Sequence, residues 1–168
     1  MHLIFSPNGI LQIDDAKIIW RNFEGRGDQY NREGDRNFAL VIPNREIADA
    51  LVNDKNSDGA SWNVKFREPK DEGDEPFMFL TVKVKFNDRG PAVFLRTGER
   101  RIRLNENSIG MLDKIDIARV DLDIRPFDNI TNGKAYRTAY LQGIEVIQDV
   151  DRFTARNTEP EGFDIPEE

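Results

Sequence analysis

Basic and aromatic side chains alternate with apolar ones over residues 79–104, and this pattern can bind a nucleic acid. Every second position of residues 79–86 is apolar, while Phe79, Lys83 and Lys85 lie on the opposite side. The following hairpin pattern adds Phe94, Arg96, Arg101 and Arg103. Single strands of nucleic acid need this combination, because cations follow the phosphates and flat rings stack on unpaired bases. We predict a binding face if these strands are neighbours; the alternative is a sheet face that is simply solvated.

Two further segments combine rings with cations. Residues 20–32 interleave glycines with side chains that could fold over a nucleic-acid strand, namely Arg21, Phe23, Arg26 and Tyr30, although two acids lie among them and Glu33 follows directly. We assign Trp20, in the same segment, to the core, because aromatic residues in strands are more often buried. Residues 134–141 place Lys134, Tyr136 and Tyr140 on one side of a strand. These three either face a ligand or close the end of a barrel.

A pair of carboxylates is the one pattern that suggests catalysis. Asp121 and Asp123 would lie on one side of a strand, about 7 Å apart, and could hold Mg²⁺ as in a nuclease. Ordinary alternation in an exposed edge strand explains the pair without any metal, and we prefer this explanation. The chain has one histidine and no cysteine, and it carries no phosphate-binding loop or nucleophile motif. We therefore expect a protein that is not an enzyme and that has no metal or cofactor.

The charge distribution matters more than the net charge of −7 that the 168 residues carry. Residues 79–104 hold seven basic and two acidic groups, whereas residues 149–168 hold seven acidic and two basic groups. A polyanion responds to this local field rather than to the total charge. No apolar run is long enough to cross a membrane, and the N-terminus lacks the pattern of a signal peptide. We expect a cytoplasmic protein.

Most of the chain reads as short strands, with only two helical segments. Strands are expected over 16–20, 38–42, 62–67, 79–86, 93–97, 100–104, 117–127 and 136–148, and helices over 44–52, capped by Asn44, and near 107–113. Trp20, Phe38 and Phe66 are the expected core residues. This composition predicts a mainly β fold, an OB-like antiparallel β-barrel with one or two short helices. We expect it to occupy residues 1–150.

Residues 151–168 form the acidic end of the chain, and we expect a flexible tail there. Such a tail can compete with a polyanion for the basic sector or recruit partner proteins. The residues expected to contact a partner are Phe163, Asp164, Ile165, Glu167 and Glu168.

The last third of the chain resembles bacterial and phage single-stranded DNA-binding proteins. The tail residues 161–166, Glu-Gly-Phe-Asp-Ile-Pro, resemble the acidic tip of that family, although Glu167 and Glu168 stand where a final aromatic residue is usual. The segments 121–126, 132–134 and 139–146 resemble phage members of the family. The resemblance implies an OB fold, sequence-independent binding of single-stranded DNA, a role in replication or recombination, and recruitment of proteins of those processes through the tail. In a phage, the compartment would be the host cytoplasm.

Our hypothesis is therefore an OB-like barrel that coats single-stranded DNA. Its main alternative is an acidic protein-binding module, such as a phage accessory or inhibitor protein that acts on a host nucleic-acid enzyme. A structural virion component is a further alternative. The sequence leaves homo-oligomerisation open.

Overall fold

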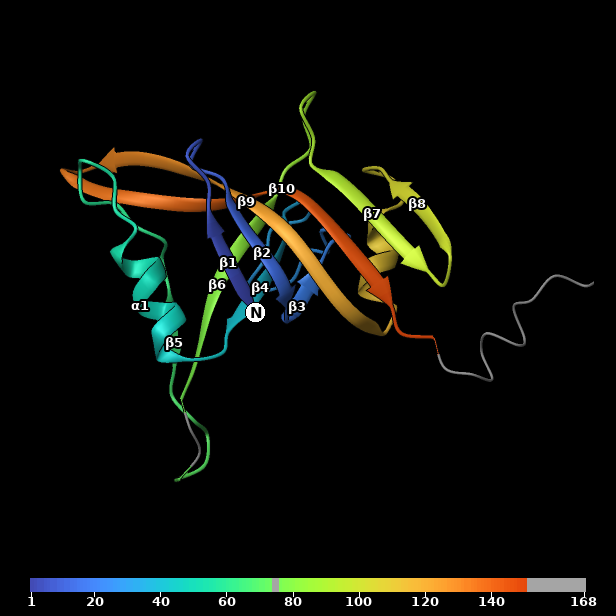
Figure 1. The fold of residues 1–168 in the computed structure, drawn as a ribbon, viewed down its shortest axis with the longest axis horizontal. Helices are drawn as coiled ribbons and strands as arrows, with labels where there is room; N and C mark the ends of the chain where they lie inside the picture. The colour runs from blue at the N-terminus through green and yellow to red at the C-terminus, as the bar shows by residue number, and fades with distance from the viewer. Residues whose placement is uncertain (74–75, 151–168) are drawn as a thin grey trace, which may run out of the picture.

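The computed structural model describes residues 1–73 and 76–150 (Figure 1). These residues contain ten strands, one α-helix and one 3₁₀-helix. In chain order they are β1 (His2–Phe5), β2 (Leu11–Ala16), β3 (Ile18–Asn22), β4 (Arg36–Ile42), α1 (Arg45–Asn53), β5 (Lys65–Arg67), β6 (Phe77–Val84), β7 (Ala92–Thr97), β8 (Arg100–Leu104), η1 (Ile109–Asp113), β9 (Ile117–Thr131) and β10 (Lys134–Gln148). Within these ranges no helix is both long and apolar enough to cross a membrane.

The strands form one mixed sheet with the order β1-β2-β9-β10-β6-β4-β3. Only Lys17 separates β2, which pairs with β9, from β3, which pairs with β4. The chain at Lys17 therefore connects strands from the two ends of this order. The sheet wraps around its core through this covalent connection, without a closed ring of hydrogen bonds. The expected mainly β, OB-like fold is confirmed, but β10 pairs in parallel with both β6 and β7. The pairing is thus mixed rather than purely antiparallel.

Alternation in the strands determines which side chains enter the core. Leu80, Val82 and Val84 of β6 are buried, while Lys83 and Lys85 on the other side are exposed, as the pattern predicts. The core prediction for Phe38 is also confirmed, since its ring is 1 % exposed. The prediction for Phe66 is wrong. The expected strand over 62–67 is reduced to β5, in which Phe66 is 55 % exposed, and Trp62 is the ring buried from this segment.

An irregularity in β3 exchanges the expected positions of two rings. The register between β3 and β4 shifts between Ile19 and Asn22, and Trp20 has a positive φ of 52°. One extra residue in a strand moves the following side chains to the other face of the sheet. Trp20 is therefore 48 % exposed, whereas Phe23 is fully buried against Phe38, with ring centroids 5.2 Å apart. Both the core assignment of Trp20 and the nucleic-acid assignment of Phe23 are wrong.

Strands β9 and β10 continue beyond the wrapped part of the sheet as a two-stranded arm. Both are longer than expected, because the connection is a tight turn at Asn132 and Gly133 rather than a loop that begins at Asp128. Both turn residues have positive φ, 52° and 75°, which is the geometry of a two-residue hairpin with an Asn-Gly turn. Figure 1 shows the arm projecting past β1 and β2 on the side of α1.

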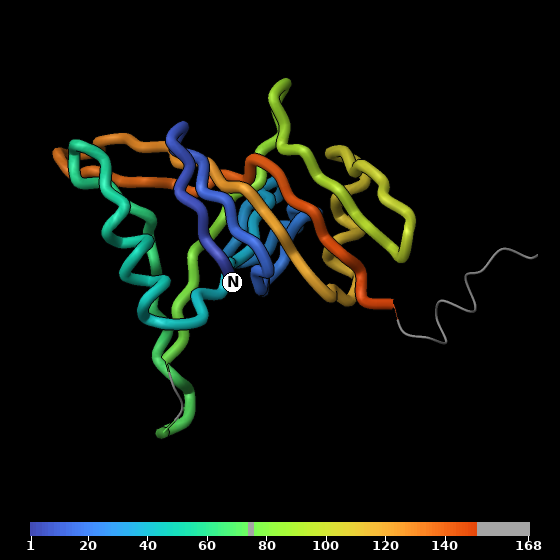
Figure 2. Tube along the Cα trace, viewed as in Figure 1, coloured from blue at the N-terminus to red at the C-terminus, as the bar shows by residue number. Residues whose placement is uncertain are grey.

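One side of the arm is fixed by the chain that follows α1, which lies along it in Figure 2. Arg137 forms two hydrogen bonds to the Asp128 carboxylate, of 2.7 and 3.0 Å, and donates a third of 3.0 Å to the Asp54 carbonyl. Its guanidinium also stacks on Trp62, whose indole N–H donates to Asp54. The opposite side of the arm therefore faces away from this contact and stays available.

Both helical predictions are confirmed. The Asn44 side chain accepts the Ile47 N–H at 2.9 Å and caps α1, which buries Ala48 and Leu51. The second helix is the single turn η1, which buries Ile109 and Leu112. Strands β1 and β2 have no counterpart among the predicted elements.

Candidate nucleic-acid interface

Three aromatic rings form a cluster on the outward face of the sheet. The Trp20 ring meets Phe79 and Phe77 edge to face, with centroids 5.0 and 5.5 Å apart. Phe77 and Phe79 share this face because they alternate with the partly buried Met78 and the buried Leu80 of β6. Arg67 pairs with Phe77 across β5 and β6, and its guanidinium lies 5.2 Å from the Trp20 ring centre. We call Trp20, Phe77 and Phe79 the aromatic platform.

Polar side chains continue this face from the aromatic platform toward β10. Asn37 of β4 and Tyr140 of β10 both pair with Lys83, so the three side chains stand on one side of neighbouring strands. Lys85 follows on the same side of the chain. In the described part of the chain neither lysine forms an ion pair with a carboxylate.

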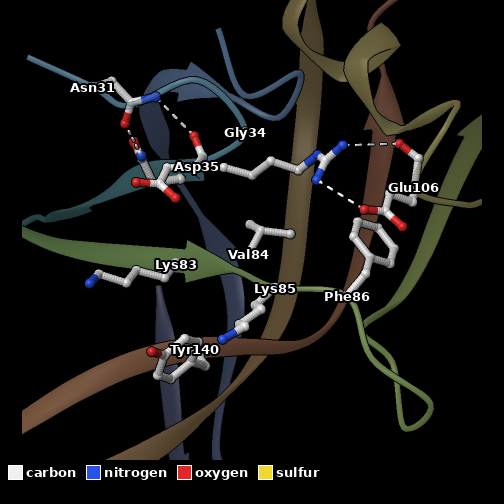
Figure 3. A pocket seen from close by; sticks show the side chains of 11 residues that line it. Asn31, Gly34, Asp35, Lys83, Val84, Lys85, Phe86, Glu106 and Tyr140 are labelled. Carbon is white, nitrogen blue, oxygen red and sulfur yellow. Dashed lines mark hydrogen bonds and ion pairs between the residues drawn. The ribbon is translucent and has the colours of Figure 1, made fainter. Parts of the chain in front are cut away.

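This face is hollowed into a groove. A hollow of about 800 Å³ lies beside Trp20, Arg67 and Thr81, and it shares Asn31 and Asn37 with a second hollow of about 490 Å³. The second, shown in Figure 3, is lined by Lys83, Lys85 and Tyr140 among others. Through Lys85 it meets a third hollow of about 340 Å³, lined also by Arg89 and Arg125. We call these three neighbouring hollows the groove.

The loop between β3 and β4 forms one wall of the groove. The Asn22 side chain accepts the Arg26 N–H at 2.9 Å, and the Asp28 carboxylate accepts the Tyr30 N–H at 2.7 Å. Asn31 connects the loop to β4, because its side-chain oxygen accepts a 2.9 Å hydrogen bond from Asn37. The loop thus brings two predicted residues, Arg26 and Tyr30, to the groove, where the Tyr30 side chain is 89 % exposed.

The free side of the arm extends the same face beyond the wrapped part of the sheet. The Arg125 guanidinium lies 4.9 Å from the centre of the Tyr140 ring, and Phe127 meets Tyr140 edge to face at 6.2 Å. Farther out, the Lys134 ammonium lies 5.6 Å from the Tyr136 ring centre. The predicted trio Lys134, Tyr136 and Tyr140 therefore lies on one side of β10, directed away from the Arg137 contact.

Arg21 lines the groove but is held by the backbone. Its guanidinium donates to the carbonyls of Leu112 and Ile115 at 2.7 and 2.8 Å, which connects β3 to the segment around η1. Phe23, which was also predicted to bind nucleic acid, lies in the core. Of the first two rings in residues 20–32, the exposed one is Trp20, which the sequence assigned to the core, and not Phe23.

The basic residues of β7 and β8 were predicted to share one face with those of β6, but they lie apart from the groove. Strands β6 and β7 do not pair with each other, because they occupy successive stretches of the same edge of β10. Arg96 and Arg101 both form ion pairs with Glu145, at 3.1 and 3.4 Å. Arg101 also covers the Phe94 ring at 3.7 Å, and Arg103 lies 5.7 Å from the same ring. Phe94 is therefore already occupied by a cation, and its face is separate from the aromatic platform.

The neighbours of Asp121 and Asp123, the two carboxylates considered for a metal site, are other groups of the protein. Asp121 accepts the Asp15 N–H at 2.8 Å and forms an ion pair with Arg119 at 3.1 Å. Burial raises the pKa of Asp123 above its usual value, and the nearby charge of Asp14 adds to the increase. Among the residues that the structure describes, no three metal-ligating side chains are grouped so that they could hold a metal ion.

The predicted partner-binding residues of the tail, Phe163, Asp164, Ile165, Glu167 and Glu168, lie outside the described residues. The division of the chain at residue 150 and the role of this end both stay predictions.

Several groove residues were missed by sequence reasoning. Phe77 was accessible to it, because the alternation of β6 continues two residues before Phe79. Arg67 could likewise have been placed beside Phe77 and Phe79, because β5 and β6 are consecutive strands that form a hairpin. Trp20 carries no such indication, since its position depends on the irregularity in β3.

Comparison with known families shows to which family the chain belongs. The family model described as "Putative phage ssDNA-binding domain" matches residues 3–164. The chain belongs to this phage single-stranded DNA-binding family. The family is one of DNA-binding proteins, and the match spans both the groove and most of the acidic end.

Similar folds occur in solved structures of a phage protein. The "Single-stranded DNA-binding protein from bacteriophage Enc34" superposes with a TM-score of 0.55 over 90 % of this chain and 87 % of that chain, at 15 % sequence identity. The same protein "in complex with ssDNA" gives a TM-score of 0.52 over 90 % of this chain and 93 % of that one, also at 15 % identity. At such low identity this likeness shows the shared fold. No curated protein sequence matches the chain significantly.

Proposed function

We propose that this member of the phage single-stranded DNA-binding family binds single-stranded DNA along the groove, without preference for sequence. The strand would run from the aromatic platform past Lys83 and Tyr140 toward Lys85 and Arg125. One observation carries the proposal: exposed rings, and cations that have no carboxylate partner among the described residues, share one hollowed face of the sheet. The Enc34 protein, which has a similar fold, has been solved with single-stranded DNA, and this supports the same ligand class here.

The chemistry of the groove suits a single strand of any sequence. Trp20 and Tyr140 offer ring faces and edges to bases, and every base has a flat face on which to stack. Lys83, Lys85 and Arg67 provide positive charge for the phosphates. Each phosphate neutralised on a single strand releases counterions, so affinity should fall steeply with salt. A duplex hides its base faces and should bind much more weakly.

The proposal extends to the biological role. Coating exposed single strands is a task of phage DNA replication and recombination, which would occur in the host cytoplasm. We propose that the protein acts there by binding alone, without a catalytic step. Residues 1–150 would form the DNA-binding domain, and the acidic residues 151–168 would recruit replication or recombination proteins.

Fluorescence anisotropy of a labelled oligo-dT of about 30 nucleotides tests the binding function. The oligonucleotide is titrated with the full chain at low and moderate salt, and a duplex of equal length serves as control. Tight binding that weakens with salt and that strongly favours the single strand is the expected result. Equal affinity for the duplex, or no binding at low salt, would refute the proposal.

A further inference from the structure

Arg36 is a cation of the groove that the sequence did not single out. It is the first residue of β4 and pairs with Val84 of β6. Its side chain packs near the Phe86 ring, with 5.7 Å from the guanidinium carbon to the ring centre. It lines the same hollow as Lys83 and Lys85, which places a third cation within the space proposed for the DNA backbone.

The only carboxylate that meets Arg36 in the described part of the chain is Glu106, and the contact is loose. One terminal nitrogen lies 3.5 Å from the Glu106 carboxylate, and the other lies 3.4 Å from the Glu106 carbonyl oxygen. The Nε atom of Arg36 is buried and finds no hydrogen-bond partner within residues 1–73 and 76–150. A guanidinium has five N–H donors in a rigid fork, so most of its hydrogen-bonding capacity is unused here. Figure 3 shows Glu106 at the rim of the hollow that Lys83, Lys85 and Tyr140 line.

Arg137 of the same protein is an arginine whose N–H donors have close hydrogen-bond partners. It forms two short hydrogen bonds to one carboxylate, and its side chain is 7 % exposed. Glu106 differs from that partner, because its side chain is 60 % exposed and lies in the turn that leads from β8 to η1. An exposed carboxylate on a turn loses little when it leaves a loose contact, since surface ion pairs contribute little to stability.

We propose that Arg36 is a phosphate-binding residue of the groove and that Glu106 is a built-in stand-in anion, which the DNA backbone displaces. The inference rests on the proposed function of the groove. A phosphate offers several acceptor oxygens in the geometry that a guanidinium matches with two parallel hydrogen bonds. It can therefore satisfy donors that Glu106 leaves unused. Glu106 in turn lowers the affinity of the free protein, because it must be displaced and because it repels phosphate.

Substitutions at both positions separate this inference from a general effect of charge. Glu106→Gln should tighten binding of the oligo-dT by about 2- to 5-fold, which is the range of a surface ion pair. Arg36→Gln should weaken binding by about 10-fold and lower the slope of log affinity against log salt by about 0.7. In the double variant the gain from Glu106→Gln should disappear, because the residue that Glu106 restrains is gone.

The matched control is Asp35→Asn, which removes one negative charge from the same hollow at a residue with no ion pair among the described residues. Its effect should be the same with and without Arg36. Thermal unfolding checks the fold of each variant, and Arg36→Lys replaces Arg36→Gln if the latter unfolds, since it keeps the charge but loses the fork.

The outcomes distinguish the two proposals. If the wild-type chain binds the single strand but Glu106→Gln behaves like Asp35→Asn, or keeps its gain without Arg36, the displacement by DNA is refuted and the groove stands. If the wild-type chain does not bind, the groove fails, and the role of Arg36 fails with it.

Discussion

Replacing Trp20 by alanine removes the most exposed ring of the aromatic platform and should weaken DNA binding strongly. The Trp20 side chain is 48 % exposed, and it touches Phe77 and Phe79 only by edge-to-face contacts. Alanine would leave those two rings in place but would remove the surface on which a base can stack. The variant therefore tests stacking in the groove without removing a core side chain.

The expected size follows from the free energy of stacking. One base on one aromatic ring contributes about 1–3 kcal/mol, and about 1.4 kcal/mol changes an equilibrium constant tenfold. The dissociation constant of Trp20→Ala should thus rise by about 5- to 150-fold. Each edge-to-face ring pair contributes about 0.5–1.5 kcal/mol, so the variant should lose some stability and still fold.

The assay is the oligo-dT titration, with Phe66→Ala as the matched control. Phe66 is 55 % exposed on β5, but it points to the side opposite Arg67 and the aromatic platform. Its removal should leave the dissociation constant within about twofold of the wild-type value, far below one lost stack. Equal effects of the two substitutions, or no effect of Trp20→Ala in a folded variant, would refute the stacking role of the aromatic platform.

Three further predictions concern charge, core and pH. Lys83→Gln should lower the slope of log affinity against log salt by about 0.7, whereas Arg101→Gln, at a residue paired with Glu145, should leave the slope near the wild-type value; equal slopes for the two variants would contradict the path through the groove. Phe23→Ala should cost about 3–5 kcal/mol in urea unfolding, because the ring is fully buried, and a loss below about 1 kcal/mol would contradict its place in the core. The hydrogen bond from Arg137 lowers the pKa of Asp128, so the stabilisation is present above the usual value of 3.8 and is lost as pH falls through the lower folded value. Thermal unfolding should therefore separate Asp128→Asn from the wild type at neutral pH and bring the two together in strong acid; a difference that persists in acid would contradict the ion pair as its cause.

Alternation alone was enough to predict a large part of the fold. The side-chain pattern of residues 79–86 placed Lys83 and Lys85 outside and Val82 inside, and the strands expected over 93–97 and 100–104 form the hairpin of β7 and β8. Such strands have a regular period and one buried face, which is the information that a sequence carries most directly. The cap of α1 at Asn44 was also visible, because an Asn side chain there can accept a helical N–H.

Two features of the site were not accessible in the same way. The face that Trp20 presents depends on a single extra residue in β3, and no alternation reports such a shift before the pairing is known. The separation of Arg101 from Lys83 depends on β6 and β7 both pairing with β10, which is a long-range arrangement. In both cases the pairing of strands, rather than the local pattern, decides where the side chains point.

The most direct test of the central claim is photochemical crosslinking of the wild-type chain to an oligo-dT that carries 5-iododeoxyuridine, followed by mass spectrometry of the crosslinked peptides. The groove predicts crosslinks at Trp20, Phe79 and Tyr140, because these rings would stack on the bases. Crosslinks confined to Phe94 or to the β1 residue Phe5, with none on the groove face, would contradict the account.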